Sequence, residues 1–314
     1  MYSMRIVFMG TPQFAVYALQ ALNESEHDVV GVVTSVDKPA GRGKQLRQSA
    51  VKEYAVAEKL HLLQPENLKD SAFTKELEFL NADVFIIVAF RMLPKTVWSI
   101  PLKGTFNLHA SLLPNYRGAA PINWAIINNE TITGATTFYI DDKIDTGAIL
   151  LKEELAIEPT ETVGSLHDKL APLGANLILK TLDYIATNPT PKPQLLTGDE
   201  KEAPKLTKEN TQIDWKQSLK YIDGLVRGLN PYPVAWLEIQ NGASVLKVKI
   251  FKAIPINEKH TLRIGNVFIE DKKIKIVHKE GILIVEELQL PNKKRMYAQA
   301  LLNGFTFENG AEVL

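Results

Sequence analysis

Asp83-Val84-Phe85-Ile86-Ile87-Val88-Ala89-Phe90 (residues 83–90) is the stretch of sequence that decides the fold. Seven consecutive apolar residues follow the aspartate, so a strand formed here presents apolar side chains on both of its faces. Strands of this kind belong to parallel sheets that helices cover on both sides. The run is far shorter than the roughly 20 residues that cross a bilayer, so we expect a buried strand and no membrane segment.

Strand-like and helix-like segments alternate on both sides of this stretch. Short apolar runs predict further strands at residues 5–9, 28–34, 104–109 and 134–140. Apolar positions with a helical period predict helices over residues 14–22, over 49–60 with Ser49 as the N-cap, and over about 162–186. This alternation predicts a doubly wound, Rossmann-like α/β domain with a mainly parallel sheet.

The composition changes after residue 187. Four prolines lie between residues 188 and 204, where neither a helix nor a central strand continues easily. After a predicted helix over 215–229, short alternating runs predict strands at residues 235–240, 245–253, 265–270, 273–278 and 282–290. We therefore predict a catalytic domain over residues 1–189, a linker over 190–206, and over 207–314 a small antiparallel sandwich or barrel, with an OB-like β-barrel preferred.

The composition bounds the classes of protein that fit. With 314 residues the chain is expected to form about two domains. Cysteine is absent, which excludes disulfides, a thiolate nucleophile and cysteine-ligated metals. The first residues show no signal-peptide pattern, so we expect a cytoplasmic protein. The net charge is zero, but residues 1–206 carry −4 and residues 207–314 carry +4. This asymmetry arises by chance or marks a surface of the small domain that faces a polyanion.

Asn107 and His109 close one of the predicted strands. Residues two apart in a strand point to the same face, so the carboxamide and the imidazole are expected to converge on one pocket. The carboxyl ends of parallel strands are where open α/β sheets bind ligands. There an asparagine donates to a developing oxyanion and a histidine moves a proton near neutral pH. The plainer alternative is a structural histidine beside a turn asparagine.

Two further segments carry polar groups. Asp141 to Gly147 follows a strand, and Asp145 is placed to orient the His109 imidazole; a plain β-turn is the alternative. Lys38 to Lys44 contains Arg42 between two glycines and predicts a basic loop that contacts phosphates, or else a solvated loop. The dinucleotide fingerprint, the P-loop, the HExxH zinc motif and the GxSxG elbow are all missing, which disfavours those chemistries.

These motifs together resemble a known family. Asn107, His109 and Asp145, joined by SLLPNYRGAAP at residues 111–121, are similar to the active site of the formyltetrahydrofolate-dependent formyltransferases. FMGTPQFAV at 8–16, PAGRGK at 39–44 and the β-rich C-terminal part resemble the members that modify tRNA. The resemblance implies transfer of the formyl group of N10-formyltetrahydrofolate to the α-amine of methionyl initiator tRNA, in translation initiation. It also implies that no metal is needed, and we expect a monomer.

The resemblance assigns a role to each matching residue. Asn107 would hold the formyl oxygen, His109 would act as acid or base, and Asp145 would tune His109. The resemblance implies folate contacts from three segments. These are Val88, Phe90 and Met92 in the first, Ser111, Leu112, Leu113 and Pro114 in the second, and Asp141 and Asp142 in the third. Contacts with tRNA fall to Lys38, Arg42 and Lys44, extended by the linker and the C-terminal domain. One position departs from the family pattern, because Arg91 stands where a glycine is usual.

Two other functions remain open from the sequence. Formyl transfer to a small amine, such as an amino sugar nucleotide or a glycinamide ribotide, would use the same three residues. A non-catalytic RNA-binding module would not need them. The basic loop and the C-terminal β domain favour a tRNA acceptor over a small one, and the three polar residues favour an enzyme over a binding module.

Overall fold

The structure, a computed structural model, describes residues 3–40 and 45–314. The chain forms two compact units. The first contains Met1–Pro121, Thr133–Leu155 and His167–Glu202; the second contains Ile122–Ile132, Ala156–Leu166 and Ala203–Leu314. Among the described residues, no helix has both the length and the apolar character needed to cross a bilayer.

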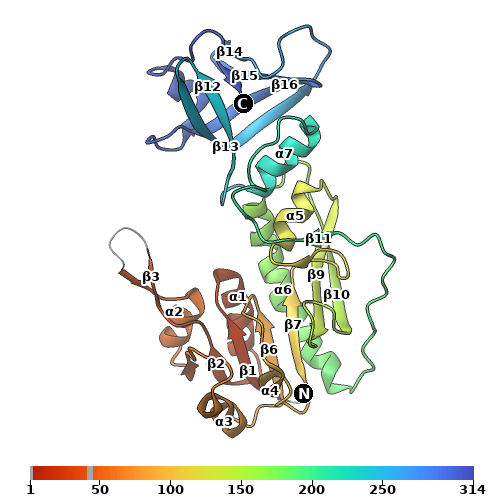
Figure 1. The fold of residues 1–314 in the computed structure, drawn as a ribbon. Coiled ribbons are helices and arrows are strands. Elements are labelled where there is room, and N and C mark those ends of the chain that lie inside the picture. The colour runs from red at the N-terminus through yellow and green to blue at the C-terminus, as the bar shows by residue number, and fades with distance from the viewer. Residues whose placement is uncertain (1–2, 41–44) are drawn as a thin grey trace. The chain divides into compact units, whose positions relative to one another are not determined.

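The first unit is built around a seven-stranded sheet. Its strands are β1 (Arg5–Gly10), β2 (Asp28–Val33), β5 (Leu62–Leu63), β6 (Val84–Val88), β7 (Thr105–His109), β9 (Ile132–Tyr139) and β10 (Ile149–Ala156). Their spatial order is β10-β9-β7-β6-β1-β2-β5 (Figure 1). All of the pairs from β5 through β7 are parallel, and β9 joins β7 in antiparallel register. The predicted doubly wound, mainly parallel sheet is therefore confirmed.

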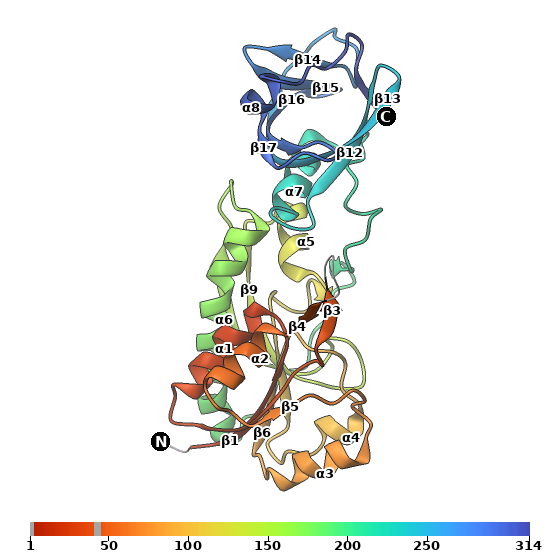
Figure 2. The same ribbon diagram turned by 90° about the vertical axis from the view of Figure 1, so that its left-hand side faces the viewer.

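Helices cover both faces of this sheet. They are α1 (Gln13–Asn23), α2 (Ala50–Ala57), α3 (Ser71–Phe79), α4 (Lys95–Trp98) and α6 (Val163–Ala186). Every residue of β6 is buried, as its two apolar faces predict. Phe85 and Ile87 pack on one side against Phe73 of α3 and Val97 of α4. Figure 2 shows α1 and α6 on the opposite side of the sheet from α3 and α4.

The order of the strands fixes where a ligand is expected. From β1 the chain builds outward to β2 and β5, and then returns to the other side of β1 with β6 and β7. The direction of winding reverses between β1 and β6, and open α/β sheets bind ligands outside the carboxyl ends of strands at such a point. Those ends are followed by Thr11 and Pro12 after β1 and by Ala89 after β6.

Two small sheets and a helix cap complete the first unit. β3 (Lys38–Ala40) pairs with β4 (Gln45–Arg47), and β8 (Arg117–Gly118) pairs with β11 (Glu202–Ala203). The Ser49 hydroxyl accepts a hydrogen bond from the Lys52 amide at 3.0 Å, so the predicted N-cap of α2 is confirmed. Arg42 and Lys44 of the predicted basic loop lie outside the described residues.

The second unit is an antiparallel β-barrel with short helices. Its strands are β12 (Ala235–Asn241), β13 (Ser244–Asn257), β14 (Val267–Glu270), β15 (Lys273–His278), β16 (Gly281–Gln289), β17 (Met296–Tyr297) and β18 (Glu312–Val313). Its helices are α5 (Pro121–Ile127), α7 (Leu219–Gly228) and α8 (Ala298–Leu302). Alternate side chains of β12, β13, β15 and β16 fill the core together with Leu225 of α7.

The barrel is nearly closed. The strand order β14-β15-β16-β13-β12-β18 leaves β14 and β18 at the two edges. These edges meet where the Val267 amide donates to the Ala311 carbonyl at 2.8 Å and the Val313 amide donates to the Gly265 carbonyl at 2.9 Å. Register shifts on either side of Lys252 bend β13 as it passes from β12 to β16. The expected C-terminal barrel is therefore confirmed.

Several elements differ from the sequence expectation. The helix expected over 215–229 begins at Leu219, because the Ser218 hydroxyl caps it. α3, α5 and β10 were not predicted. The proline-rich segment, which the sequence predicts to be a linker, is attached to the sheet, since Ile149 and Lys192 exchange backbone hydrogen bonds of 2.7 and 3.0 Å.

Candidate active site

β7 carries Asn107 and His109 to the carboxyl edge of the sheet. Asn107 lies between Ile87 of β6 and Phe138 of β9, and His109 is paired with Thr136 of β9. The two side chains are separated by two positions on an extended strand and therefore share a face. Asn107 is half-buried and His109 is 6% exposed. Both residues belong to β7, and of the two only Asn107 lines the cavity described below, although the sequence predicts that both side chains converge on one pocket.

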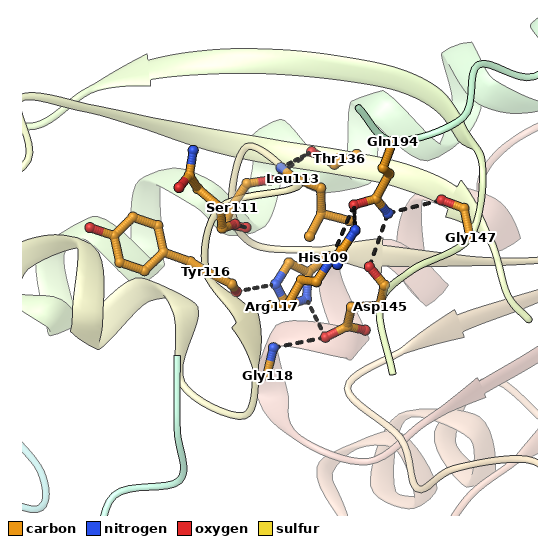
Figure 3. Close-up of polar contacts among 11 residues, drawn as sticks. His109, Ser111, Leu113, Tyr116, Arg117, Gly118, Thr136, Asp145, Gly147 and Gln194 are labelled. Carbon is orange, nitrogen blue, oxygen red and sulfur yellow. Dashed lines mark hydrogen bonds and ion pairs between the residues drawn. The ribbon is translucent and has the colours of Figure 1, made fainter. Parts of the chain in front are cut away.

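His109 has a partner on each ring nitrogen (Figure 3). Its Nε2 lies 2.7 Å from the carbonyl oxygen of Tyr116, and its Nδ1 lies 3.7 Å from Oδ2 of Asp145. A carbonyl oxygen only accepts, so Nε2 must carry the hydrogen of that bond. Nδ1 is consequently the nitrogen that faces the carboxylate. The Gly118 amide also donates to Oδ2 of Asp145 at 2.9 Å.

The turn that carries Asp145 is shaped by its own residues. Oδ1 of Asp141 accepts hydrogen bonds from the Lys143 amide at 2.9 Å and from the Thr146 hydroxyl at 2.7 Å. Asp145 has a φ of 54°, a left-handed conformation that Asp tolerates better than most residues. A Cβ at Gly147 would lie 1.6 Å from the Tyr139 carbonyl oxygen, so only glycine fits there. Asp141 and Gly147 thus set the position of the Asp145 carboxylate.

The loop after β7 is held by hydrogen bonds to its own backbone and to neighbouring strands. The Ser111 hydroxyl donates to the Asn115 carbonyl at 2.7 Å. The Thr136 hydroxyl donates to the Ser111 carbonyl at 2.7 Å and accepts from the Leu113 amide at 3.1 Å. Lys152 of β10 donates to the Leu113 carbonyl, and burial lowers the pKa of this lysine. The loop is therefore a rigid support beside His109.

A cavity of about 330 Å³ opens beside these groups. Its lining residues are Ile87, Phe90, Arg91, Met92, Leu93, Asn107, Gly118, Ala119, Phe138, Ile140, Asp141, Lys143, Ile144 and Asp145. Asn107 and Asp145 thus reach the same cavity. His109 is not a lining residue; it lies behind Asp145 and contacts that carboxylate.

The expected folate residues divide between the cavity wall and its support. Phe90, Met92 and Asp141 line the cavity. Val88, Ser111 and Leu113 are buried and are not lining residues, and neither are Asp142, Leu112 or Pro114. The first unit therefore offers a largely apolar cavity with a few converging polar groups, as small-molecule sites commonly do.

A second cavity of about 540 Å³ shares a wall with the first. Phe90 and Arg91 line both. The other lining residues follow β1, β2 and β6 or precede α2, namely Thr11, Pro12, Ser35, Val36, Lys38, Arg47, Gln48, Ser49 and Ala89. Lys38, which the sequence analysis assigned to tRNA, belongs to this second cavity. Its three cationic side chains suit an anionic ligand.

Arg91, the departure from the family pattern, fixes the shared wall. Its guanidinium donates to the carbonyls of Glu66, at 3.0 Å, and of Pro65, and it lies 5.6 Å from the centre of the Phe90 ring. One planar fork spans two carbonyls, which lysine cannot reproduce. The segment that follows β6 is thereby tied to the segment that follows β5.

Sequence reasoning missed Gln194 altogether. Its carboxamide bonds to the turn of Asp145 and to Arg117, although it lies in the proline-rich segment. Its neighbours in the sequence carry no sign of this, because the contacts span 49 and 77 residues. Across residues 3–40 and 45–314, no group of three or more His, Asp or Glu side chains is placed to hold a metal ion.

Two family models match this chain. The formyl transferase family model matches residues 4–182, and the model of the formyl transferase C-terminal domain matches residues 205–306. Methionyl-tRNA formyltransferase of Flavobacterium johnsoniae is 54% identical over the full length of both chains. The protein of the same name from Bacteroides thetaiotaomicron is 49% identical over 98% of this chain and 97% of its own.

Solved structures share the fold at low identity. HypX from Aquifex aeolicus, in complex with tetrahydrofolic acid, has a TM-score of 0.62 at 18% identity, covering 96% of this chain and 47% of that one. An N-formyltransferase from Helicobacter canadensis, in complex with folinic acid and dTDP-3-aminofucose, has a TM-score of 0.65 at 21% identity, covering 90% and 98%. The family models and the full-length relatives are decisive: this chain belongs to the methionyl-tRNA formyltransferase family of formyl transferases.

Proposed function

We propose that this chain transfers the formyl group of N10-formyltetrahydrofolate to the α-amine of methionyl initiator tRNA. The observation that carries the proposal is that Asn107 and Asp145 line one cavity while His109 lies 3.7 Å from Asp145. This arrangement supports a hydrogen-bond donor and a proton-transfer pair that act at one reacting centre. The full-length similarity to methionyl-tRNA formyltransferases supports the choice of donor and acceptor.

Asn107 is proposed to stabilise the transition state. The neutral amine attacks the formyl carbon, a C–N bond forms, and the formyl oxygen takes up negative charge. An α-amine with a pKa of about 8 supplies enough neutral form at physiological pH. A preorganised donor at such an oxygen contributes roughly 3–4 kcal/mol to transition-state stabilisation. Asn107, on the rigid strand β7, supplies that donor.

His109 and Asp145 are proposed to move the proton. The attacking nitrogen must lose a proton, and N10 of the folate must gain one as its bond to the formyl carbon breaks. Nδ1 of His109 faces Oδ2 of Asp145 at 3.7 Å, so the two groups are close enough to pass a proton from one to the other when they approach during the reaction. Because Asp145 lines the cavity and His109 does not, Asp145 is the member of the pair that meets the reacting nitrogens. His109 exchanges the proton through it.

The two cavities are proposed to receive the two substrates. The first, with Phe90 and Met92 in its wall, suits the flat pterin ring of the folate. The second contains Lys38, Arg47 and Arg91, which suit the phosphates at the acceptor end of tRNA. Residues 207–314 form the proposed tRNA-binding domain, residues 190–206 the linker and residues 1–189 the catalytic domain. Arg42 and Lys44 are proposed to add further tRNA contacts.

A transfer assay with three acceptors tests the proposal. Formyl-tetrahydrofolate is supplied with charged initiator tRNA, with an amino sugar nucleotide or with glycinamide ribotide, and the products are identified by mass spectrometry. We expect formylation of the methionyl-tRNA alone. Transfer to a small amine with none to tRNA would replace the proposed acceptor, and no transfer to any of the three would refute the enzymatic role.

A further inference from the structure

Gln194 makes four hydrogen bonds with its side-chain amide, all within the first unit (Figure 3). Its Nε2 donates to the carbonyls of Asp145 and Gly147, both at 2.9 Å. Its Oε1 accepts from Nε of Arg117 at 3.1 Å and from Nη2 of Arg117 at 2.6 Å. A primary amide has two N–H donors and two acceptor sites, so every one of them is engaged.

The backbone delivers Gln194 to this place by a local pairing. Lys192, two residues before it, exchanges two backbone hydrogen bonds with Ile149 at the start of β10. Ile149 lies two residues after Gly147. The proline-rich segment is therefore anchored beside the end of the Asp145 turn, and Gln194 is the first side chain beyond Lys192 that both donates and accepts.

The two loops that Gln194 joins are those that hold the acid–base pair. One loop carries Asp145, whose φ of 54° must be maintained by contacts outside the residue. The other loop, around Arg117, supplies the Tyr116 carbonyl to His109 and the Gly118 amide to Asp145. A displacement between the loops would alter the separation of His109 Nδ1 from Asp145 Oδ2. One side chain thus bridges both supports.

We propose that Gln194 is a positioning residue, which fixes the separation of His109 and Asp145 from within the proline-rich segment of the first unit. It lines neither of the two cavities and acts through the backbone of the Asp145 turn. The inference rests on the proposed function, because it assumes that this pair moves the proton.

The test compares Gln194→Ala and Gln194→Glu with Leu195→Ala, whose side chain is 81% exposed in the same segment. Gln194→Glu keeps an acceptor for Arg117 but has no N–H for the two turn carbonyls. We expect both Gln194 variants to lower kcat by about 10-fold or more, with KM for both substrates nearly unchanged. We also expect the midpoint of the kcat–pH profile to move by about half a unit or more. Leu195→Ala should behave as wild type.

Melting temperatures and two reference variants complete the experiment. All variants should melt within a few degrees of wild type, so that the kinetic loss is not a loss of fold. Wild-type kcat and pH profile in Gln194→Ala would overturn the inference, and so would wild-type kcat in Gln194→Glu or a change confined to KM. Asp145→Asn and His109→Ala test the proposed function separately from the role of Gln194. Full activity in these would refute the proposed function, whereas their inactivity beside a normal Gln194→Ala would refute only the role of Gln194.

Discussion

Asn107 and His109 occupy one strand two positions apart, yet only Asn107 reaches the cavity directly. We predict that Asn107→Ala and His109→Ala each lower the rate of formyl transfer by about 100-fold or more, because a lost oxyanion donor and a lost proton carrier each cost that much. The measurement is single-turnover transfer to methionyl-tRNA. His61→Ala, at an exposed histidine of the same unit, is the matched control and should retain the wild-type rate. A near wild-type rate in either active-site variant would remove its proposed role.

Arg91 allows a second prediction about a single residue. Its guanidinium joins the carbonyls of Pro65 and Glu66 and lies over Phe90, which forms part of the wall shared by the two cavities. Arg91→Ala frees that wall, so we expect KM for formyl-tetrahydrofolate to rise by about 3-fold or more while kcat changes less. Arg91→Lys should show nearly the same raised KM as Arg91→Ala, since one ammonium group cannot span both carbonyls. An unchanged KM in Arg91→Ala would show that the wall does not depend on this clamp.

The residues of the site differ in how far the sequence alone could predict them. Asn107 and His109 follow from the two-residue period of a strand, which is local information. The residues around Asp145 allow either a plain turn or a partner for His109, and the resemblance to a family favoured the second interpretation. Gln194 was missed because its partners lie 47 to 77 residues away and the segment around it, with Pro191 and Pro193, shows neither a helical nor a strand period. Contacts of that range follow from the pairing of Ile149 with Lys192, and no local pattern encodes that pairing.

At the scale of elements, strong periodicity decided which segments could be predicted. β6 and α6 carry continuous apolar patterns and were predicted nearly to the residue. β10 was missed because only part of it is buried and its Lys-Glu-Glu sequence is poor in strand formers. α3 buries only Phe73 and Leu77 and gives a correspondingly weak helical signal. The beginning of α7 was predicted too early because Ser218, and not Trp215, ends the preceding turn.

The connection between β2 and α2 supports a prediction about pH. Asp37 accepts hydrogen bonds from Lys52 Nζ at 2.7 Å and from Gln64 Nε2 at 3.1 Å. The Lys52 bond, followed by the Gln64 bond, lowers the pKa of Asp37 below its usual value. A carboxyl group whose pKa is lower in the folded state stabilises the fold above its unfolded pKa, and this contribution is lost as the pH falls through the folded pKa.

We therefore expect Asp37→Asn to be less stable than wild type at neutral pH, by a margin that shrinks below about pH 4. Urea denaturation of both proteins, repeated at intervals of about half a pH unit between pH 3 and pH 7, measures the difference in the free energy of unfolding. A margin that stays constant across the acid range would contradict the assigned hydrogen bonds. Lys52→Met removes the hydrogen-bond donor to Asp37. The free energy of unfolding of this variant should therefore lose the same dependence on pH.

At the scale of the whole molecule, two domains were predictable from composition, but the membership of the second unit was not. α5 and residues 156–166 group with the barrel although the sequence places them inside the first domain. The Asn123 side chain donates to the Gly228 carbonyl at 2.7 Å, and a Cβ at Gly228 would lie 2.6 Å from Ile127. α5 and α7 therefore pack so closely that only glycine fits at position 228. Contact across about 100 residues is not visible in local periodicity.

The charge of the second unit gives the last prediction. Lys247 lies 3.5 Å from the centre of the Trp236 ring, with Lys208 at 5.8 Å from the same ring and Lys249 opposite Trp236 in the strand pairing. Burial, and then the charge of Lys208, lowers the pKa of Lys247; Glu238 opposes this shift, and Lys249 adds a smaller lowering effect. Trp236 itself is buried, so the ring supports the lysines while their ammonium groups suit the phosphates of an RNA backbone. We predict that this face binds the tRNA.

The double variant Lys247→Ala/Lys249→Ala should weaken tRNA binding by about 10-fold and reduce the slope of log K against log salt by about 1.5, because two phosphate contacts are lost. KM for formyl-tetrahydrofolate should stay the same, since no residue of this face lines the cavity that we propose for the folate. Lys293→Ala/Lys294→Ala removes the same charge from an exposed segment of the same unit and is the matched control. If both double variants lose affinity equally, net charge alone attracts the tRNA; if only the first does, the lysines around Trp236 form the contact surface.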